Sequence, residues 1–158
     1  MKVDLYERFW LWVSGALIVA FLGAIGVAAA LRSVHPPSHV ETVDPTRVRT
    51  DTEFAEPRVV TRDDGSVLVI AVAELYQFRP GTIRVPAGVP VTFRITSPDV
   101  IHGFQIVNTN VNTMVAPGYV SQLTVTFARA GEYLVLCNEY CGLSHHLMQS
   151  RVVVEESP

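Results

Sequence analysis

The sequence of 158 residues predicts an all-β domain preceded by a single N-terminal transmembrane helix. Residues 9–31 carry no charged side chain, which is typical of a membrane helix. From residue 58 onward, short apolar segments alternate with polar residues at period two and are separated by turn residues. We therefore divide the chain into an anchor at 1–32, a linker at 33–57 and a β domain at 58–158.

The anchor is long enough to cross a bilayer. At a rise of about 1.5 Å per residue, residues 9–31 span roughly 34 Å, and the hydrocarbon core is about 30 Å thick. Trp10 and Trp12 lie at one end, where aromatic rings favour the membrane interface. A cleaved signal peptide is the alternative, because residues 28–30 are small, but the apolar run is longer than a signal requires. We expect a retained anchor in contact with membrane lipid.

The segment after the anchor is rich in proline and polar residues, and the chain beyond the anchor is mildly acidic. Residues 33–57 contain four prolines among many polar residues, and Asp44 followed by Pro45 is a signal for a short helix. After residue 32 the chain has nine arginines against thirteen aspartates and glutamates, a net charge of −4. A mildly acidic domain is a poor nucleic-acid binder, so we expect no nucleic-acid partner.

The β domain is predicted from its alternation of apolar and polar residues. Residues 67–73 are apolar throughout and predict a strand buried on both faces, whereas residues 91–96 alternate with polar residues and predict a half-buried strand. Further strands are predicted at 123–127, 133–137 and 152–154, and no long helical pattern follows residue 32. Short, closely spaced strands of this kind indicate an antiparallel sandwich or barrel.

The residues that carry chemistry are concentrated in a segment of twelve near the C-terminus. The two cysteines, Cys137 and Cys141, are followed by His145 and Met148. Two cysteines in an exported domain often form a disulfide, and this alternative stays open. Two thiolates, an imidazole and a thioether make a soft ligand set that suits copper, however, and zinc seldom uses methionine.

A second imidazole is expected from elsewhere in the fold. His102 is the candidate, at the end of a predicted strand, although a histidine in such a position is more often structural. His146 adjoins His145, and spacing alone does not choose between them. His35 and His39 lie in the predicted linker and are given no role.

Two segments together resemble a known family. Cys137-x-Glu139-x-Cys141-Gly142-x-x-His145-x-x-Met148 is similar to the CuA loop of cytochrome c oxidase subunit II. The upstream segment Ser97-Pro98-Asp99-Val100-Ile101-His102-Gly103-Phe104 resembles the segment that carries that family's first histidine. The similarity covers most of residues 60–156, and the single anchor resembles the short B-type oxidase subunits.

The resemblance implies a fold, a cofactor and a set of ligands. The fold is a cupredoxin-like Greek-key barrel, and the cofactor is a binuclear CuA centre of two copper ions bridged by both cysteine sulfurs. The implied ligands are His102 and His145, which bind one copper each, with Met148 and the backbone carbonyl of Glu139 as weak outer ligands. The resemblance therefore selects His145 over His146.

The resemblance also implies partners and a location. The subunit would accept electrons from cytochrome c or a similar carrier and pass them to haem in subunit I, where oxygen is reduced to water and protons are translocated. Its copper domain would lie on the outer side of the plasma membrane. The segment around Glu7 resembles the B-type segment whose glutamate stands at the entrance of the proton path, and residues 114–118 form an apolar loop that could face a cytochrome.

Three other functions compete with this interpretation. A CuA-bearing nitric oxide reductase would keep the copper pair in a different complex. A copper chaperone or thiol oxidoreductase of the thioredoxin type would need alternating strands and helices, which the pattern lacks. A disulfide-stapled interaction domain would hold no metal.

Overall fold

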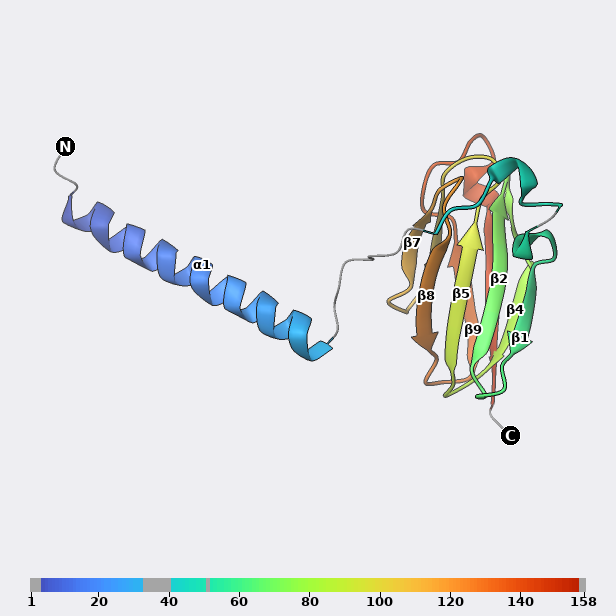
Figure 1. Cartoon of the computed structure of the whole chain (residues 1–158), viewed down its shortest axis with the longest axis horizontal. Helices are drawn as coiled ribbons and strands as arrows, with labels where there is room; N and C mark the ends of the chain where they lie inside the picture. Colours follow the sequence, from blue (N-terminus) through green and yellow to red (C-terminus); the bar gives the residue numbers. More distant parts are fainter. Residues whose placement is uncertain (1–3, 33–40, 51, 157–158) are drawn as a thin grey trace. The chain divides into compact units, whose positions relative to one another are not determined.

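The computed structural model describes residues 4–32, 41–50 and 52–156 of the chain, drawn in colour in Figure 1. The chain divides into two compact units, residues 1–39 and residues 40–158, and each is described by itself.

The N-terminal unit contains one long helix, α1 (Leu5–Arg32). Asp4 precedes it and accepts a hydrogen bond from the backbone N–H of Tyr6, which satisfies one of the free donors of the first turn. The apolar residues surround the helix rather than forming one stripe, and the segment Leu5–Ala30 has a mean hydropathy of 2.3. The prediction of an N-terminal helix long and apolar enough to cross a membrane is confirmed.

The second unit is a sandwich of two five-stranded sheets (Figure 1). The first sheet has the order β1-β2-β5-β8, with β3 paired to the far end of β2. Its strands are β1 (Arg58–Thr61), β2 (Val67–Glu74), β3 (Gln77–Arg79), β5 (Pro90–Thr96) and β8 (Ser121–Thr126). The second has the order β4-β10-β9-β6-β7. Its strands are β4 (Thr82–Pro86), β6 (His102–Ile106), β7 (Asn112–Val115), β9 (Gly131–Leu136) and β10 (Gln149–Glu155).

Most strand pairs are antiparallel, as expected, but two are parallel. β2 pairs in parallel with β5, and β4 pairs in parallel with β10. Neither pair is joined by a hairpin: β3 and β4 intervene between β2 and β5, and β5 to β9 intervene between β4 and β10. Alternation within a strand reports which side chains are buried and says nothing of the direction of its neighbour, so the sequence pattern could not reveal these two pairs.

The main core lies between the two sheets. Phe93 of β5 and Phe104 of β6 face each other across it, with ring centroids 5.5 Å apart. Val91, Phe93 and Ile95 of β5 are all fully buried there, as their alternation predicts. β2 is buried on both faces, which confirms the prediction made from its unbroken apolar run.

The outer face of the first sheet is covered by residues 41–50 and 52–56, which we call the strap. Its short 3-10 helices are η1 (Pro45–Arg47), capped by Asp44 as predicted, and η2 (Glu53–Ala55). Val48 and Phe54 of the strap are buried against Ile70 and Val72 of β2. The sequence pattern places residues 33–57 in a linker, whereas residues 41–50 and 52–56 belong to the same compact unit as the β strands. Two apolar side chains among many polar ones were too weak a signal to reveal this packing.

An ion-pair cluster fastens the strap to the sheet. Arg94 of β5 donates to Glu41 at 2.9 Å and to Gln122 of β8 at 2.8 Å, and it pairs closely with Glu53. The hydrogen bond from Arg94 lowers the pKa of Glu41. The sequence predicts β5 to be half-buried, but its second face is largely buried too: Thr92 and Thr96 are both buried, and Thr96 donates to the carbonyl of Tyr119.

Candidate metal centre

Three strand ends bring the predicted donors to one end of the sandwich. His102 is the first residue of β6, Cys137 follows the last residue of β9, and Met148 precedes β10. β9 runs antiparallel to both β6 and β10, so its C-terminal end lies beside their N-terminal ends. The N–H of Cys137 donates to the carbonyl of Met148 at 3.2 Å, which fixes this register at the site itself.

The two thiols form the middle of the cluster. Both cysteines are free and buried, and their Sγ atoms lie 3.8 Å apart. The Sγ of Cys137 is 3.9 Å from Nδ1 of His102 and 3.2 Å from the carbonyl oxygen of Glu139. The Sγ of Cys141 is 3.5 Å from Nδ1 of His145 and 3.7 Å from Sδ of Met148. Each thiol therefore has one imidazole nitrogen and one weaker donor within 4 Å.

A tight loop presents the second half of this cluster. The N–H of His145 donates to the carbonyl of Gly142, and the N–H of Met148 donates to that of His145, around the 3-10 helix η3 (His145–Leu147). Gly142 has φ of +130°, and a side chain there would lie 2.7 Å from the hydroxyl of Tyr76. Glycine is therefore required at 142 both by its backbone conformation and by the close approach of Tyr76.

One nitrogen of the His102 ring faces the sulfurs, and the other contacts Asp99. Its Nε2 lies 2.9 Å from Oδ1 of Asp99, and the ring is fully buried. Burial raises the pKa of Asp99, but hydrogen bonds from His102 and from the N–H groups of Leu75 and Val100 outweigh this effect, so the pKa is lowered. Asp99 is therefore a carboxylate at neutral pH, and its oxygen can only accept a hydrogen bond from Nε2 of His102.

The thiol of Cys141 is held in its protonated form in the metal-free protein. Burial, together with the interaction with Cys137, raises the pKa of Cys141 to about 11. A metal ion would have to displace this proton, because the thiolate is the form that ligates.

All six predicted donor residues are thus brought together. A strand pattern could not show the close approach of the Glu139 carbonyl, which depends on the turn between the cysteines. The His146 side chain is exposed, which agrees with the choice of His145. Glu7 lies in the first turn of α1, in the other unit, and its role stays a prediction. His35 and His39 lie outside the described residues.

The residue that sequence reasoning missed is Asp99. It stands in the turn Ser97-Pro98-Asp99, where an aspartate is ordinary turn chemistry. Its position three residues before His102 was the available signal. Residues three apart lie on the same face of a helix, but this segment is a turn and not a helix. Only the fold therefore shows that the Asp99 and His102 side chains meet.

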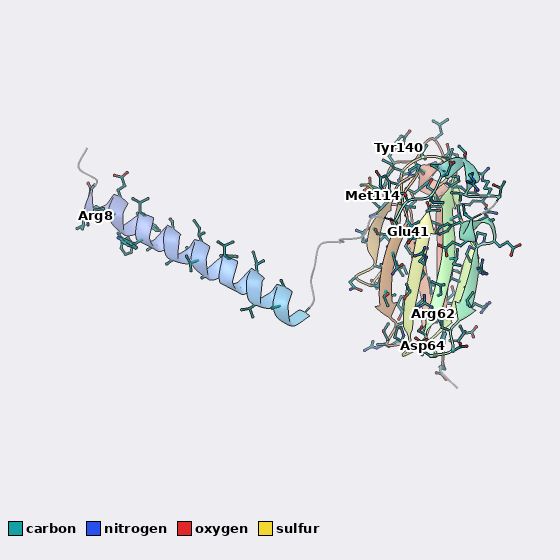
Figure 2. All side chains as sticks on the ribbon, in the orientation of Figure 1. Arg8, Glu41, Arg62, Asp64, Met114 and Tyr140 are labelled. Atoms are coloured by element: carbon teal, nitrogen blue, oxygen red, sulfur yellow. The ribbon has the colours of Figure 1, made fainter. Side chains whose placement is uncertain are left out.

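An apolar rim surrounds the centre. Its exposed side chains are Ile101, Met114, Tyr140, Leu143 and Leu147, with Leu143 88% exposed. Tyr140 and Met114 lie toward one end of the β domain, and Arg62 and Asp64 lie at the opposite end (Figure 2). Exposed apolar side chains gathered around one site are typical of a protein-contact surface.

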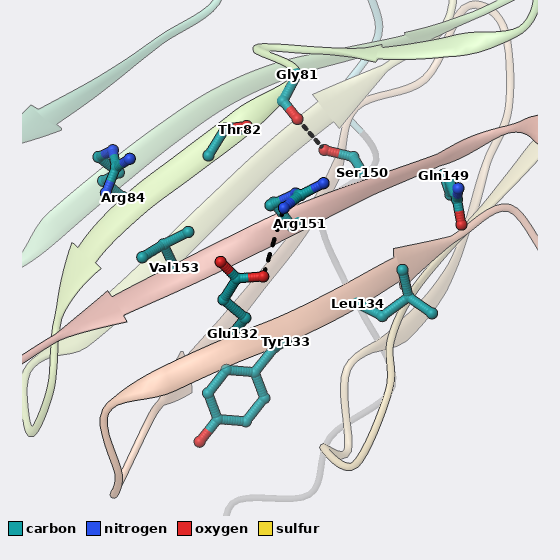
Figure 3. A pocket seen from close by; sticks show the side chains of 10 residues that line it. All are labelled: Gly81, Thr82, Arg84, Glu132, Tyr133, Leu134, Gln149, Ser150, Arg151 and Val153. Atoms are coloured by element: carbon teal, nitrogen blue, oxygen red, sulfur yellow. Dashed lines mark hydrogen bonds and ion pairs between the residues drawn. The ribbon is translucent and has the colours of Figure 1, made fainter.

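A groove of the β domain lies away from the thiols. It has a volume of about 630 Å³ and runs over the outer face of β4, β10 and β9 (Figure 3). Its polar side chains already bind one another: Arg151 pairs with Glu132, and Ser150 donates to the carbonyl of Gly81 (Figure 3). Its lining contains no cysteine, histidine or methionine, so the metal chemistry is assigned to the thiol cluster.

Comparison with known proteins agrees with this geometry. Residues 59–157 match the family described as cytochrome c oxidase subunit II, periplasmic domain. Cytochrome c oxidase subunit 2 of Thermus thermophilus is 42% identical over 155 residues, which cover 96% of this chain and 92% of the relative. A second subunit 2 from Thermus thermophilus is 43% identical over 135 residues, covering 84% of this chain and all of the relative.

Solved structures show the same fold. A chain from the cryo-EM structure of a heme-copper terminal oxidase dimer superimposes with a TM-score of 0.73 at 29% identity, over 95% of this chain and 99% of that one. The periplasmic domain of subunit II of the Bradyrhizobium japonicum oxidase superimposes with a TM-score of 0.53 at 19% identity, over 64% of this chain and 88% of that one, which supports the cupredoxin-like fold alone. With the family match over most of its length, the chain belongs to the family of cytochrome c oxidase subunit II.

Proposed function

We propose that this chain holds a binuclear copper centre, CuA, and accepts electrons one at a time from cytochrome c or a similar carrier for a haem-copper oxidase. It passes them to haem in subunit I, where oxygen is reduced to water and protons are translocated. The observation that carries the proposal is the convergence of two free thiols, two imidazole nitrogens, a thioether and a carbonyl at contacts of 3.2–3.9 Å.

The donor set fits copper better than zinc. A structural zinc site would be complete with two cysteines and two histidines, and the sulfur of Met148 would not be a ligand. Here Met148 is 2% exposed and aims its sulfur at Cys141. Thioethers and thiolates are soft ligands that favour copper.

The same set exceeds what one copper ion needs. A mononuclear electron-transfer site uses two histidines, one cysteine and one weak axial donor. This cluster adds a second thiol and a second weak donor, the Glu139 carbonyl. His102, Cys137, Cys141 and His145 would be the strong ligands of two ions, with Met148 and Glu139 as the weak ones.

The protein's own contribution is a rigid and largely dry set of ligands. Bound copper would supply a one-electron redox change. The strand ends and the η3 loop fix the donors before any metal arrives, so little of the chain has to move when the charge changes. Cys137, Cys141, Met148 and His102 are all buried, which keeps water from the sulfurs.

The apolar rim is the proposed contact for the electron donor. Because the domain carries a net charge of −4 after residue 32, long-range attraction would favour a basic carrier, while Leu143 and Tyr140 would make the close contact. α1 would anchor the subunit in the plasma membrane beside subunit I, with the β domain on the periplasmic side. Glu7 is proposed to stand at the entrance of the proton path.

Copper stoichiometry and spectroscopy on the full chain in detergent test the proposal. After loading with copper, the protein is expected to bind two ions per chain and to show the multiline EPR pattern of one unpaired electron shared by two copper nuclei. Cys137→Ser and Cys141→Ser should each abolish this signal. His146→Ala is the matched control for His145→Ala and should leave the signal intact.

The rival functions give different results. A protein that binds one copper, binds only colourless zinc, or is isolated with a Cys137–Cys141 disulfide that does not load copper would contradict the proposal. Oxygen and nitric oxide consumption by the complex assembled with subunit I separates an oxidase from a nitric oxide reductase.

A further inference from the structure

The two histidines of the centre differ in what holds the far side of their rings. Nε2 of His102 is 2.9 Å from a carboxylate oxygen of Asp99, and its ring is fully buried. His145 is partly exposed. Besides Cys141, its ring lies near the ring of Tyr140, with the two ring centroids 5.8 Å apart. Within the described part of the chain, no hydrogen bond is found for its other ring nitrogen.

Asp99 is itself fixed by two backbone N–H groups that donate to it and by a serine hydroxyl. Its Oδ2 accepts from the N–H of Leu75 at 2.9 Å, and its Oδ1 accepts from the N–H of Val100 at 2.7 Å. The hydroxyl of Ser97 lies 3.0 Å from Oδ1. The carboxylate therefore cannot rotate away from His102 without losing bonds from two separate segments of the chain.

A carboxylate in this position determines what the imidazole can do. An acceptor at Nε2 requires the proton to be on that nitrogen, which leaves the lone pair of Nδ1 directed toward Cys137. A negative charge behind an imidazole also raises its basicity and strengthens its bond to a metal. No residue of the described ranges places a carboxylate behind the His145 ring, so the two imidazoles are unequal donors.

We propose that Asp99 is a positioning residue that locks His102 in its Nε2–H tautomer and makes it the stronger imidazole donor of an asymmetric centre. The predicted effects of Asp99 on copper affinity and reduction potential rest on the proposed function, whereas the tautomer of His102 can be measured in the metal-free protein. The carboxylate would stabilise the oxidised centre, so its removal raises the reduction potential.

The first experiment uses the metal-free full chain in detergent, with ¹⁵N-labelled histidine and signals assigned from single His→Gln variants. Wild-type His102 is expected as the Nε2–H tautomer with slow exchange of that proton. In Asp99→Ala and Asp99→Asn, either the Nε2 proton of His102 should exchange with solvent at least about tenfold faster, or both tautomers of His102 should be populated. The signals of His145 should stay unchanged. Identical His102 signals and exchange in wild type and Asp99→Ala overturn the proposal, whether or not copper binds.

The second experiment uses the copper-loaded chain and a charge-matched control. Asp99→Asn should weaken copper binding about 10–100-fold in chelator competition, as loss of a partner behind a metal ligand usually does, and should raise the reduction potential. Asp64→Asn removes the same charge at the opposite end of the domain (Figure 2) and should behave as wild type. Equal potentials and affinities in the two variants overturn the proposed effect on the metal, and failure of wild type to bind copper contradicts the proposed function instead.

Discussion

Gly103 and Asn138 lie so close together that a side chain on Gly103 would collide with Asn138. An added Cβ would come within 2.8 Å of the backbone nitrogen of Asn138 and closer still to its side-chain oxygen. Asn138 stands between Cys137 and Glu139 and donates to Asn112 of β7 at 3.0 Å. The absence of a side chain at 103 therefore lets the cysteine loop dock against the β6–β7 hairpin.

Gly103→Ala is expected to push the cysteine loop away from β6. Overpacking of this kind costs about 1–3 kcal/mol, and the displaced Cys137 should reduce copper stoichiometry as well. Urea denaturation and copper counting measure the two effects. Gly81→Ala is the control, since its nearest contact would be an ordinary 3.9 Å. Equal stability and copper content in both variants would show that the loop position does not depend on Gly103.

Met148→Leu is expected to retain copper and to raise the reduction potential. The two side chains have similar volumes, so the buried site should lose less than about 1.5 kcal/mol of stability. The weak axial sulfur is lost, and with it some stabilisation of the oxidised metal. Redox titration with mediators checks this, with the exposed Met114→Leu as control. Complete loss of copper from Met148→Leu would contradict a weak-ligand role.

The metal-free protein is expected to lose stability in alkaline solution because of Cys141. Burial raises the pKa of this thiol from 9.0 to about 11, so the folded state holds the proton more tightly than the unfolded state. The resulting stabilisation is present below pH 9 and is lost as the pH rises through about 11. Denaturation from pH 8 to 11 should therefore show a shallower decline in Cys141→Ser. A decline of equal slope would assign the effect to other groups.

Copper uptake should release protons for the same reason. The raised pKa of Cys141 keeps its thiol protonated at neutral pH, and this thiol must become a thiolate when it ligates. Copper affinity is thus expected to rise with pH between 6 and 8, with proton release detected in a weakly buffered titration. Uptake without proton release would mean that the thiols do not ligate.

Arg94→Gln is expected to release the strap from the first sheet. The side chain is 16% exposed and holds two carboxylates, so its loss should cost about 1–3 kcal/mol. Hydrogen exchange at residues 41–56 should increase. Arg84→Gln, which removes an exposed pair with Glu155, should cost less than about 1 kcal/mol. Unchanged exchange in Arg94→Gln would mean that Val48 and Phe54 hold the strap without it.

Leu143→Gln is expected to slow electron transfer from cytochrome c without changing the copper content. Loss of one central apolar contact typically costs about 1–2 kcal/mol of binding, which is about 5–30-fold in the second-order rate. Stopped-flow reduction of the loaded protein measures it. Leu134→Gln, on the outer face of β9, is the matched control. If both variants react like wild type, the donor does not dock on the apolar rim.

Much of the architecture was predictable because it depends on local pattern. The uncharged run of α1 predicts a helix of membrane-spanning length, the unbroken apolar run of β2 predicts a strand buried on both faces, and both predictions are confirmed. The alternation at 91–96 correctly predicts the core-facing side chains of β5 but not the burial of its other face. The packing of the strap was not predictable, because Val48 and Phe54 are single apolar residues whose partners lie in β2. The parallel pairing of β2 with β5 is likewise a property of the whole sheet.

The sequence by itself determined which metal donors this protein can offer, because soft side chains at Cys137, Cys141, His145 and Met148 are a property of residue type and spacing. Only the tertiary structure decided how those donors are presented. The antiparallel register of β6, β9 and β10 brings His102 to the thiols from far along the chain, and the turn at 97–101 places Asp99 behind its ring. Contacts between residues on separate strands depend on register and twist, which no one-dimensional pattern contains.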